Sequence, residues 1–168
     1  MTTGLTKYDR SLYAVMNRRE GRPFYATAAR RRAVVCAHIA LTAIGSAAWI
    51  TAVFAERMWP LFVLFGVLLP WCVANGVING ATRGLLELRS RALDERQLRE
   101  RDRVLARAHR LTSLLLLAAA VGTGALSWLG DVRVEALIAP VLVEVFIVHA
   151  LMPHWVAGLT VPDEPDED

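Results

Sequence analysis

The sequence predicts an all-α protein: a four-helix transmembrane bundle with an N-terminal amphipathic helix and a charged cytoplasmic helical hairpin. The chain has 168 residues, is 55% hydrophobic and has a mean hydropathy of +0.37, which is more apolar than soluble domains of this length usually are. Its apolar residues gather in runs close to the about 20 residues that a helix needs to cross a bilayer. Its charge is segregated, since residues 1–32 and 81–110 hold 17 of the 19 lysines and arginines.

Residues 1–32 are expected to form a cytoplasmic or interfacial segment. Within them, apolar residues recur at steps of three and four over residues 5–19, which predicts an amphipathic helix. Such a helix would lie in the membrane interface with its arginines towards anionic headgroups, or it would pack on the cytoplasmic hairpin. The sequence leaves both arrangements open. Gly21 and Pro23 end the helix, because glycine and proline interrupt helices.

Residues 33–158 form the predicted transmembrane domain. The spans are expected over about 33–55, 61–81, 111–129 and 134–155. Short loops that contain Arg57 and Arg133 join the spans at the side opposite the termini, so consecutive spans run antiparallel. The remaining residues, 159–168, are acidic and interrupted by proline, and this composition is typical of a disordered tail.

The charged hairpin over 82–110 separates the second span from the third. Residues 83–110 contain nine arginines and five acidic residues, so this segment cannot enter a bilayer. Asp94 followed by Gln97 has the form of a reciprocal helix cap, and it predicts a helix that runs directly into the third span. Residues 82–92 are expected to hold an extension of the second span followed by a turn. Leu98 and Leu105 are predicted to line one face of the hairpin.

The distribution of basic residues predicts the orientation. With both termini and residues 81–110 inside, 17 basic residues face the cytoplasm and two face out, as the positive-inside rule requires. The chain is therefore expected to be a multi-pass protein of the inner (cell) membrane. Trp59 and Trp128 would mark the outer interface and Trp155 the inner one. Because the basic blocks flank apolar spans, they are explained without a nucleic-acid partner.

Three glycines, Gly76, Gly80 and Gly84, recur every four residues near the end of the second span. Small residues at this spacing allow two membrane helices to approach closely. The stripe is expected to pack either against other helices of the same chain or against a partner in a homo-oligomer or larger membrane complex.

Polar residues at membrane depth form a predicted intramembrane patch. Glu144 lies near the middle of the fourth span, where a charged carboxylate costs several kcal/mol unless it is paired, wetted or protonated. Counting residues along antiparallel spans places His38, Asn79 and His149 at similar depth in the inner leaflet, with Asn75 nearer to Glu144. In a structural interpretation, Glu144 is protonated, the histidines are neutral, and the two asparagines and backbone groups satisfy them by hydrogen bonds. In a functional one, Glu144 handles protons or a substrate.

A third interpretation of the patch is a cofactor or metal site. His38 and His149 would act as axial haem ligands, or Cys36 would join them around a transition metal. No HxxxH, ExxH or CxxCH pattern supports such a site, so no cofactor and no metal are predicted. Phosphate-binding and nucleophile motifs of the GxxxxGK and GxSxG types are also absent from the sequence. We therefore expect no enzymatic activity.

The function predicted from these observations is that of a non-enzymatic interaction, accessory or scaffold protein. Arg96, Arg99 and Arg103 of the hairpin are the expected contacts to a cytoplasmic protein partner or to anionic membrane lipid. One alternative is a small proton-coupled transporter or carrier centred on Glu144. A second is a haem- or metal-binding redox protein that uses His38 and His149.

The hairpin sequence LDERQLRERDRVLARAHR, followed by a Leu/Ala-rich span, resembles uncharacterised small four-span integral membrane proteins of actinobacteria. The resemblance covers about residues 80–130 and rests on the charge pattern. It implies an inner-membrane location and carries no activity, cofactor or catalytic residue with it.

Overall fold

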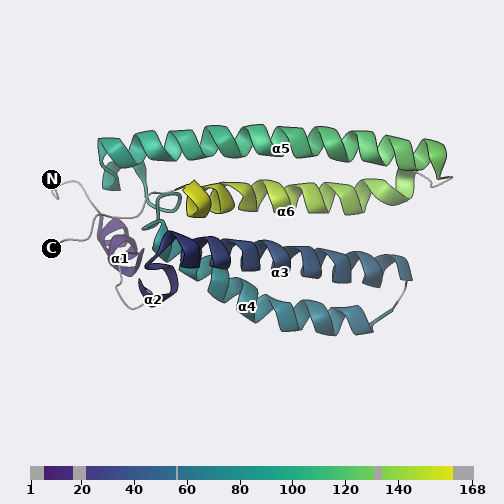
Figure 1. The fold of residues 1–168 in the computed structure, drawn as a ribbon, viewed down its shortest axis with the longest axis horizontal. Coiled ribbons are helices and arrows are strands. Elements are labelled where there is room, and N and C mark those ends of the chain that lie inside the picture. Colours follow the sequence, from purple (N-terminus) through teal and green to yellow (C-terminus); the bar gives the residue numbers. More distant parts are fainter. Residues whose placement is uncertain (1–5, 17–21, 56, 131–133, 161–168) are drawn as a thin grey trace.

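A computed structural model describes residues 6–16, 22–55, 57–130 and 134–160, and within these ranges it contains helices and turns but no strand (Figure 1). The elements in chain order are α1 (Lys7–Met16), α2 (Arg22–Tyr25), α3 (Ala28–Ala55), α4 (Trp59–Ala81), the 3-10 helix η2 (Ser90–Ala92), α5 (Glu95–Leu129) and α6 (Val134–Thr160). α6 continues through Leu159 and Thr160, so the predicted disordered tail begins at least two residues too early. The rest of that tail, residues 161–168, and Arg133 lie outside the described residues.

Four helices, α3, α4, α5 and α6, are long and apolar enough to cross a membrane. The first of them begins earlier than the predicted residue 33, because the Thr27 hydroxyl accepts a hydrogen bond from the backbone N–H of Arg30 at 3.3 Å. A threonine in this position satisfies one of the free N–H groups of a helix start. Pro60 lies in the first turn of α4, where its missing N–H costs nothing.

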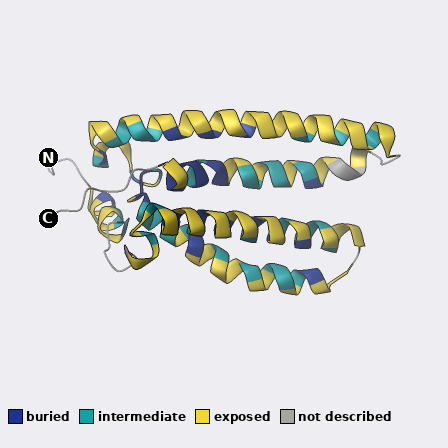
Figure 2. Ribbon diagram, viewed as in Figure 1, coloured by how far each residue is buried: buried dark blue, intermediate teal, exposed yellow. Residues whose placement is uncertain are grey.

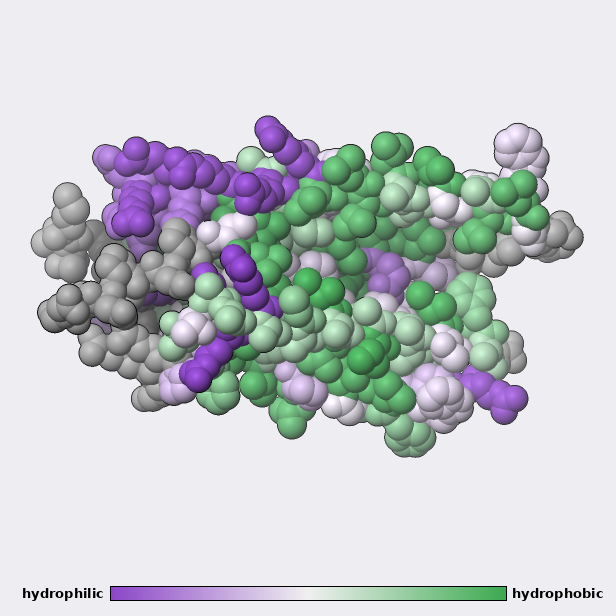
Figure 3. All heavy atoms as spheres, in the orientation of Figure 1, coloured by the Kyte–Doolittle hydropathy of each residue, from purple (hydrophilic) through white to green (hydrophobic). Residues whose placement is uncertain are grey.

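The long helices lie side by side, with α3 against α4, α5 against α6, and α6 in contact with both α3 and α4 (Figure 1). The short helices α1 and α2, residues 82–94 and the first turns of α5 gather at one end of the molecule, which we call the polar end. Figure 3 shows hydrophilic residues concentrated there and hydrophobic residues over the remaining length. This separation is what a protein with one end in water and its middle in lipid requires.

The buried core lies towards the polar end, around the second half of α6 (Figure 2). It comprises Val35, Ile78, Leu85, Val104, Ala108, Leu151, Met152, Trp155, Val156 and Ala157. Gly158 allows α3 to approach α6, because a Cβ added there would lie 2.6 Å from a methyl group of Val35. The Nε of Arg31 donates a 3.0 Å hydrogen bond to the carbonyl of Gly158. This contact places the positive charge of Arg31 at the C-terminal end of α6, where the helix dipole stabilises a cation.

The turn predicted within residues 82–92 is present, but the predicted helical extension of the second span before it is wrong. α4 ends at Ala81, and Arg83 (φ 52°) and Gly84 (φ 67°) take the left-handed conformation that terminates helices. The chain then folds back on the bundle, and Leu85 and Leu88 are buried. The burial of these leucines stabilises a compact turn where helix propensity and charge pairs alone indicate a longer helix.

The predicted cap and the helix that follows it are confirmed. The carboxylate of Asp94 accepts from the backbone N–H of Gln97 at 2.7 Å, and the Gln97 side chain accepts from the backbone N–H of Asp94 at 3.0 Å. α5 then runs without interruption through the predicted third span. The predicted face is wrong, however, because Leu105 is 39% exposed and α5 buries Val104 and Ala108 instead. Small side chains at this spacing let α6 approach closely.

The N-terminal helix α1 packs on the segment that follows α4. Asp9 is 2% exposed and its Oδ2 lies 2.6 Å from a guanidinium nitrogen of Arg91. Burial alone would raise the pKa of the Asp9 carboxyl, but hydrogen bonds from Thr6 and the charge of Arg91 outweigh it and hold that pKa below its ordinary value. Of the two arrangements that the sequence leaves open, the structure shows packing on the hairpin, while Tyr8 and Tyr13 remain exposed.

Candidate functional sites

The predicted polar patch does not form one cluster of hydrogen bonds. Oε1 of Glu144, Oδ1 of Asn75 and Nε2 of His38 are all buried and have no hydrogen-bond partner among the described residues. The structural interpretation, in which the asparagines and the backbone satisfy Glu144 and the histidines, is therefore not met at these three atoms. Asn79 is half-buried, and its backbone carbonyl accepts from the N–H of Gly84 at 2.9 Å where α4 ends.

His38 lies instead in an aromatic cluster that joins three helices. The ring is fully buried, and its Nδ1 accepts a 2.8 Å hydrogen bond from the indole N–H of Trp155 in α6. Its face packs on Trp71 of α4, with 4.8 Å between the ring centroids. The indole N–H of Trp71 donates to the hydroxyl of Thr42 at 2.9 Å. The expectation that Trp155 marks the inner interface is wrong, because its ring is buried against His38.

The hydrogen bond from Trp155 determines the tautomer of His38. An indole N–H only donates, so Nδ1 is the acceptor and the neutral ring carries its proton on Nε2. A histidine that ligates a metal needs a free lone pair and usually donates from its other nitrogen, whereas here one nitrogen is occupied and the other is protonated. His149 lies on the exposed surface of α6. The pairing of these two histidines as haem ligands is therefore not supported.

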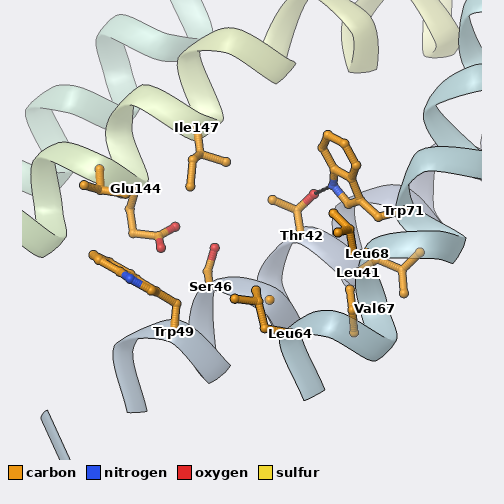
Figure 4. Close-up of a pocket in the computed structure, with 12 residues that line it drawn as sticks. Leu41, Thr42, Ser46, Trp49, Leu64, Val67, Leu68, Trp71, Glu144 and Ile147 are labelled. Carbon is orange, nitrogen blue, oxygen red and sulfur yellow. Dashed lines mark hydrogen bonds between the residues drawn. The ribbon is translucent and has the colours of Figure 1, made fainter. Parts of the chain in front are cut away.

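Glu144 borders a cavity of about 340 Å³ between α3, α4 and α6 (Figure 4). The cavity is lined by Leu41, Thr42, Gly45, Ser46, Trp49, Leu64, Val67, Leu68, Trp71, Val143, Glu144 and Ile147. Figure 4 shows the carboxylate directed towards α3, where the Ser46 hydroxyl and the Trp49 ring lie on either side of it. Glu144 also borders a cavity of about 200 Å³ between α5 and α6. Glu144, the residue at the centre of the functional interpretation, therefore borders apolar cavities in the structure.

The arginines predicted to contact partners are exposed at the polar end of α5. Arg96, Arg99 and Arg103 share one helix face with Arg107 and Arg110, since all five recur at steps of three and four residues. We call these five residues the arginine row. Arg107 and Arg110 were not predicted as partner contacts, although the spacing of the arginines in the sequence places them on this face.

The residues around the arginine row are held by several contacts. A guanidinium nitrogen of Arg101 donates to the carbonyl of Leu88 at 3.3 Å. Nε2 of His154 lies 3.2 Å from Oε1 of Glu87, which ties the segment after α4 to the end of α6. The start of α5 is thus joined to the segment after α4, and that segment to the end of α6.

The glycine stripe does not pack as one seam within the chain. A Cβ added at Gly76 would meet no atom within 4 Å, and one at Gly80 would lie 3.5 Å from the ring of Tyr25 in α2. Gly84 lies in the turn after α4, where a Cβ would approach the Met16 side chain to 2.8 Å. Close approach is therefore confined to Gly84, and a homo-oligomer through Gly76 stays a prediction.

The described residues define a class of protein: an all-helical chain with four apolar helices of membrane-spanning length and a basic polar end. No protein family, curated protein or solved structure matches this chain. The resemblance of residues 80–130 to actinobacterial four-span proteins therefore stays a prediction, and the function must be argued from the sites themselves.

Proposed function

We propose that this chain is a multi-pass protein of the inner (cell) membrane that acts as a non-enzymatic interaction protein, docking an acidic protein partner on its arginine row. Its four apolar helices form a transmembrane bundle, both termini are cytoplasmic, and the polar end projects into the cytoplasm. The orientation is supported by the basic residues of the polar end. Trp59 and Trp128, exposed at the opposite end, suit the aromatic belt of the outer interface.

The observation that carries this proposal is the exposure of five arginines along one face of a continuous helix. From Arg96 to Arg110 the row extends about 21 Å along α5 at 1.5 Å per residue. The row runs along the direction of the spans, so lipid headgroups reach only the arginines nearest the membrane. A partner that pairs with the whole row must itself stand away from the bilayer. An acidic surface or helix of a protein meets this requirement.

The fixed position of α5 favours binding. A rigid helix presents its guanidinium groups without the entropic cost of ordering a loop. Two other arginines of the same segment, Arg89 and Arg91, lie 3.8 Å and 2.6 Å from the Asp9 carboxylate and serve the fold. Within the row, Arg99 contacts Glu95, since its Nε donates to the Glu95 carbonyl at 3.1 Å, while all five guanidinium groups stay exposed to a partner.

Cross-linking in cells tests the proposal. A photo-reactive benzoylphenylalanine replaces Ala106, which is exposed beside the row, or Ser11 on α1 as the position control. We expect a discrete cross-linked protein from position 106 and none from position 11. Replacing Arg96, Arg99 and Arg103 with Ser should reduce that product at least about tenfold, the effect of losing about 1.4 kcal/mol of binding free energy.

A matched variant removes the same charge elsewhere at the polar end. Replacing Lys7, Arg10 and Arg32 with Ser, all three exposed, should leave the cross-linked product unchanged. A product that survives loss of the row, or cross-links to lipid alone, would overturn the proposal. Cysteine placed at position 96 should react only after the inner membrane is permeabilised, and labelling in intact cells would overturn the orientation.

The carrier alternative also has a specific observation in its favour, namely the Glu144 carboxylate in a cavity between the spans. Substituting Glu144→Gln keeps a hydrogen-bonding side chain and removes the charge. Vesicle flux that is unchanged in this variant would remove the main support for a carrier.

A further inference from the structure

We propose that the cavity bordered by Glu144 binds a lipophilic organic cation, such as a quaternary ammonium or a protonated amine, within the membrane. The proposal concerns binding alone, and it depends neither on the arginine row nor on transport. It rests on three properties of the cavity: its one ionisable side chain, its aromatic and aliphatic lining, and its position between the spans.

The first property is a carboxyl group without a neighbouring positive charge. Among the residues that line the cavity, Glu144 is the one ionisable side chain, and no lysine or arginine lies beside it. Its Oε1 is buried and has no hydrogen-bond partner in the described structure. A carboxylate at membrane depth is stabilised by pairing with a positive charge. Since the lining supplies none, a bound cation is the group that would complete the site.

The second property is the chemistry of the walls. Leu41, Leu64 and Val67 offer aliphatic surface to hydrocarbon groups, and Trp49 and Trp71 offer indole rings. Organic cations are attracted to the faces of aromatic rings, tryptophan most strongly. The hydrogen bond from Trp71 to Thr42 holds one of these rings in place. A volume of about 340 Å³ lies within the range of small-molecule sites.

A metal ion fits the same lining poorly. Calcium and magnesium require six or more oxygen ligands, whereas the side-chain oxygens here belong to Thr42, Ser46 and Glu144. The Thr42 hydroxyl is already engaged, donating to the carbonyl of His38 at 2.8 Å and accepting from Trp71. Transition metals prefer histidine or cysteine, and the lining contains neither. The donor set therefore favours an organic cation.

The third property is the position of the cavity between the spans. The lining comes from α3, α4 and α6 and includes no residue of α5, and Glu144 lies 10 residues into α6, about 15 Å along the helix axis. That depth is near the centre of a bilayer whose hydrocarbon is about 30 Å thick. A molecule with both charge and hydrocarbon surface partitions to this depth far better than a small hydrated ion does.

The binding test uses the full chain in nanodiscs of neutral lipid and a pair of isosteric probes. Benzyltrimethylammonium carries the charge, and neopentylbenzene has the same shape without it. Binding is measured by equilibrium dialysis against empty nanodiscs. We expect stoichiometric, saturable binding of the cation and at least about tenfold weaker binding of the neutral isostere, because the charge supplies the pairing with Glu144.

Three variants assign the site. Glu144→Gln should weaken binding of the cation at least about tenfold and leave the neutral isostere unaffected. Glu135→Gln removes the same charge from an exposed position on α6 and should leave both affinities unchanged. Gly45→Leu fills the cavity, since the Cβ at this position would lie 3.6 Å from Leu64, and should weaken both probes.

The outcomes that overturn the proposal are distinct from these. Equal affinity for cation and isostere would show an apolar cleft filled by lipid chains. Cation binding that is unchanged by Glu144→Gln would place the site elsewhere, and the absence of saturable binding to the wild-type chain would remove it altogether. Circular dichroism and gel filtration of each variant establish that it is folded before its binding is compared.

Discussion

The indole N–H of Trp155 donates a 2.8 Å hydrogen bond to Nδ1 of His38 and so joins α6 to α3 inside the bundle. Both side chains are buried, and the second indole that contacts the ring, that of Trp71, comes from α4. One histidine therefore connects three helices through a hydrogen bond and a ring contact.

Removing this hydrogen bond should destabilise the bundle. Trp155→Phe keeps most of the ring but leaves Nδ1 of His38 without its donor, which costs about 1–3 kcal/mol for a buried polar group. The measurement is unfolding by denaturing detergent, followed by circular dichroism. Trp128→Phe is the control. Because Trp128 is 90% exposed, this variant should unfold like the wild type. Equal stability of the two variants would show that the His38 hydrogen bond contributes nothing.

The same hydrogen bond predicts the outcome of a cofactor assay. Since Nδ1 of His38 is occupied and Nε2 carries the proton, the ring is not prepared to ligate haem iron or a transition metal. Protein purified with its native lipids should therefore show no Soret band and no stoichiometric metal by elemental analysis. A Soret band that disappears in His38→Ala would contradict the tautomer and revive the redox alternative.

The contact between Asp9 and Arg91 predicts a pH dependence at the polar end. The pKa of Asp9 is held below its ordinary value of 3.8, so this carboxylate stabilises the docking of α1 at all pH values above 3.8. The stabilisation is lost as the pH falls through the lowered pKa, because protonation removes the negative charge that faces Arg91. Hydrogen exchange should show α1 protected at pH 5 and progressively less protected as the pH falls below 3.8.

Substitutions separate this contact from general acid unfolding. In Asp9→Asn, α1 should exchange rapidly at pH 5 as well, and trypsin should cleave more readily at Lys7 and Arg10. Glu95→Gln is the matched control, because Glu95 is 94% exposed and lies 4.0 Å from Arg99, a type of pair that contributes little. Unchanged protection of α1 in Asp9→Asn would refute the prediction.

The close approach of α3 and α6 predicts a selective glycine effect. In Gly158→Ala the new Cβ would lie 2.6 Å from Val35 and 3.4 Å from Ile78, and overpacking of this kind costs about 1–3 kcal/mol. Gly122→Ala adds the same methyl group to α5, where no atom lies within 4 Å. It should be neutral or slightly stabilising, since alanine favours helix. The two variants are compared by the detergent denaturation used for Trp155.

Local features of the sequence predict the helices well. The Asp94–Gln97 cap and the continuous helix after it follow from the chemistry of neighbouring residues, and both are observed. The face that α5 buries does not follow in the same way. Leu98 and Leu105 are the larger apolar residues, yet Val104 and Ala108 are buried, because the distance between α5 and α6 decides which side chains fit. That distance depends on residues far away in the chain.

For the candidate site at Glu144, too, the sequence predicts the single residue but not the residues around it. The sequence alone identifies Glu144 as an ionisable residue deep in an apolar helix, because hydropathy is a local property. It does not identify Ser46, Trp49 and Trp71 as the residues around the Glu144 cavity, or Trp155 as the donor to His38. Those partners are set by the rotation of each helix about its axis.

The amino-acid sequence by itself determined that four helices are long and apolar enough to cross a membrane and that the basic residues gather at one end. The tertiary structure alone decided that the chain turns at Arg83 and Gly84, that His38 is bonded to Trp155, and that Glu144 borders a cavity. The physical reason is that partition between lipid and water depends on the composition of each segment. Contacts between helices depend on shape, and shape is fixed only when all the helices pack together.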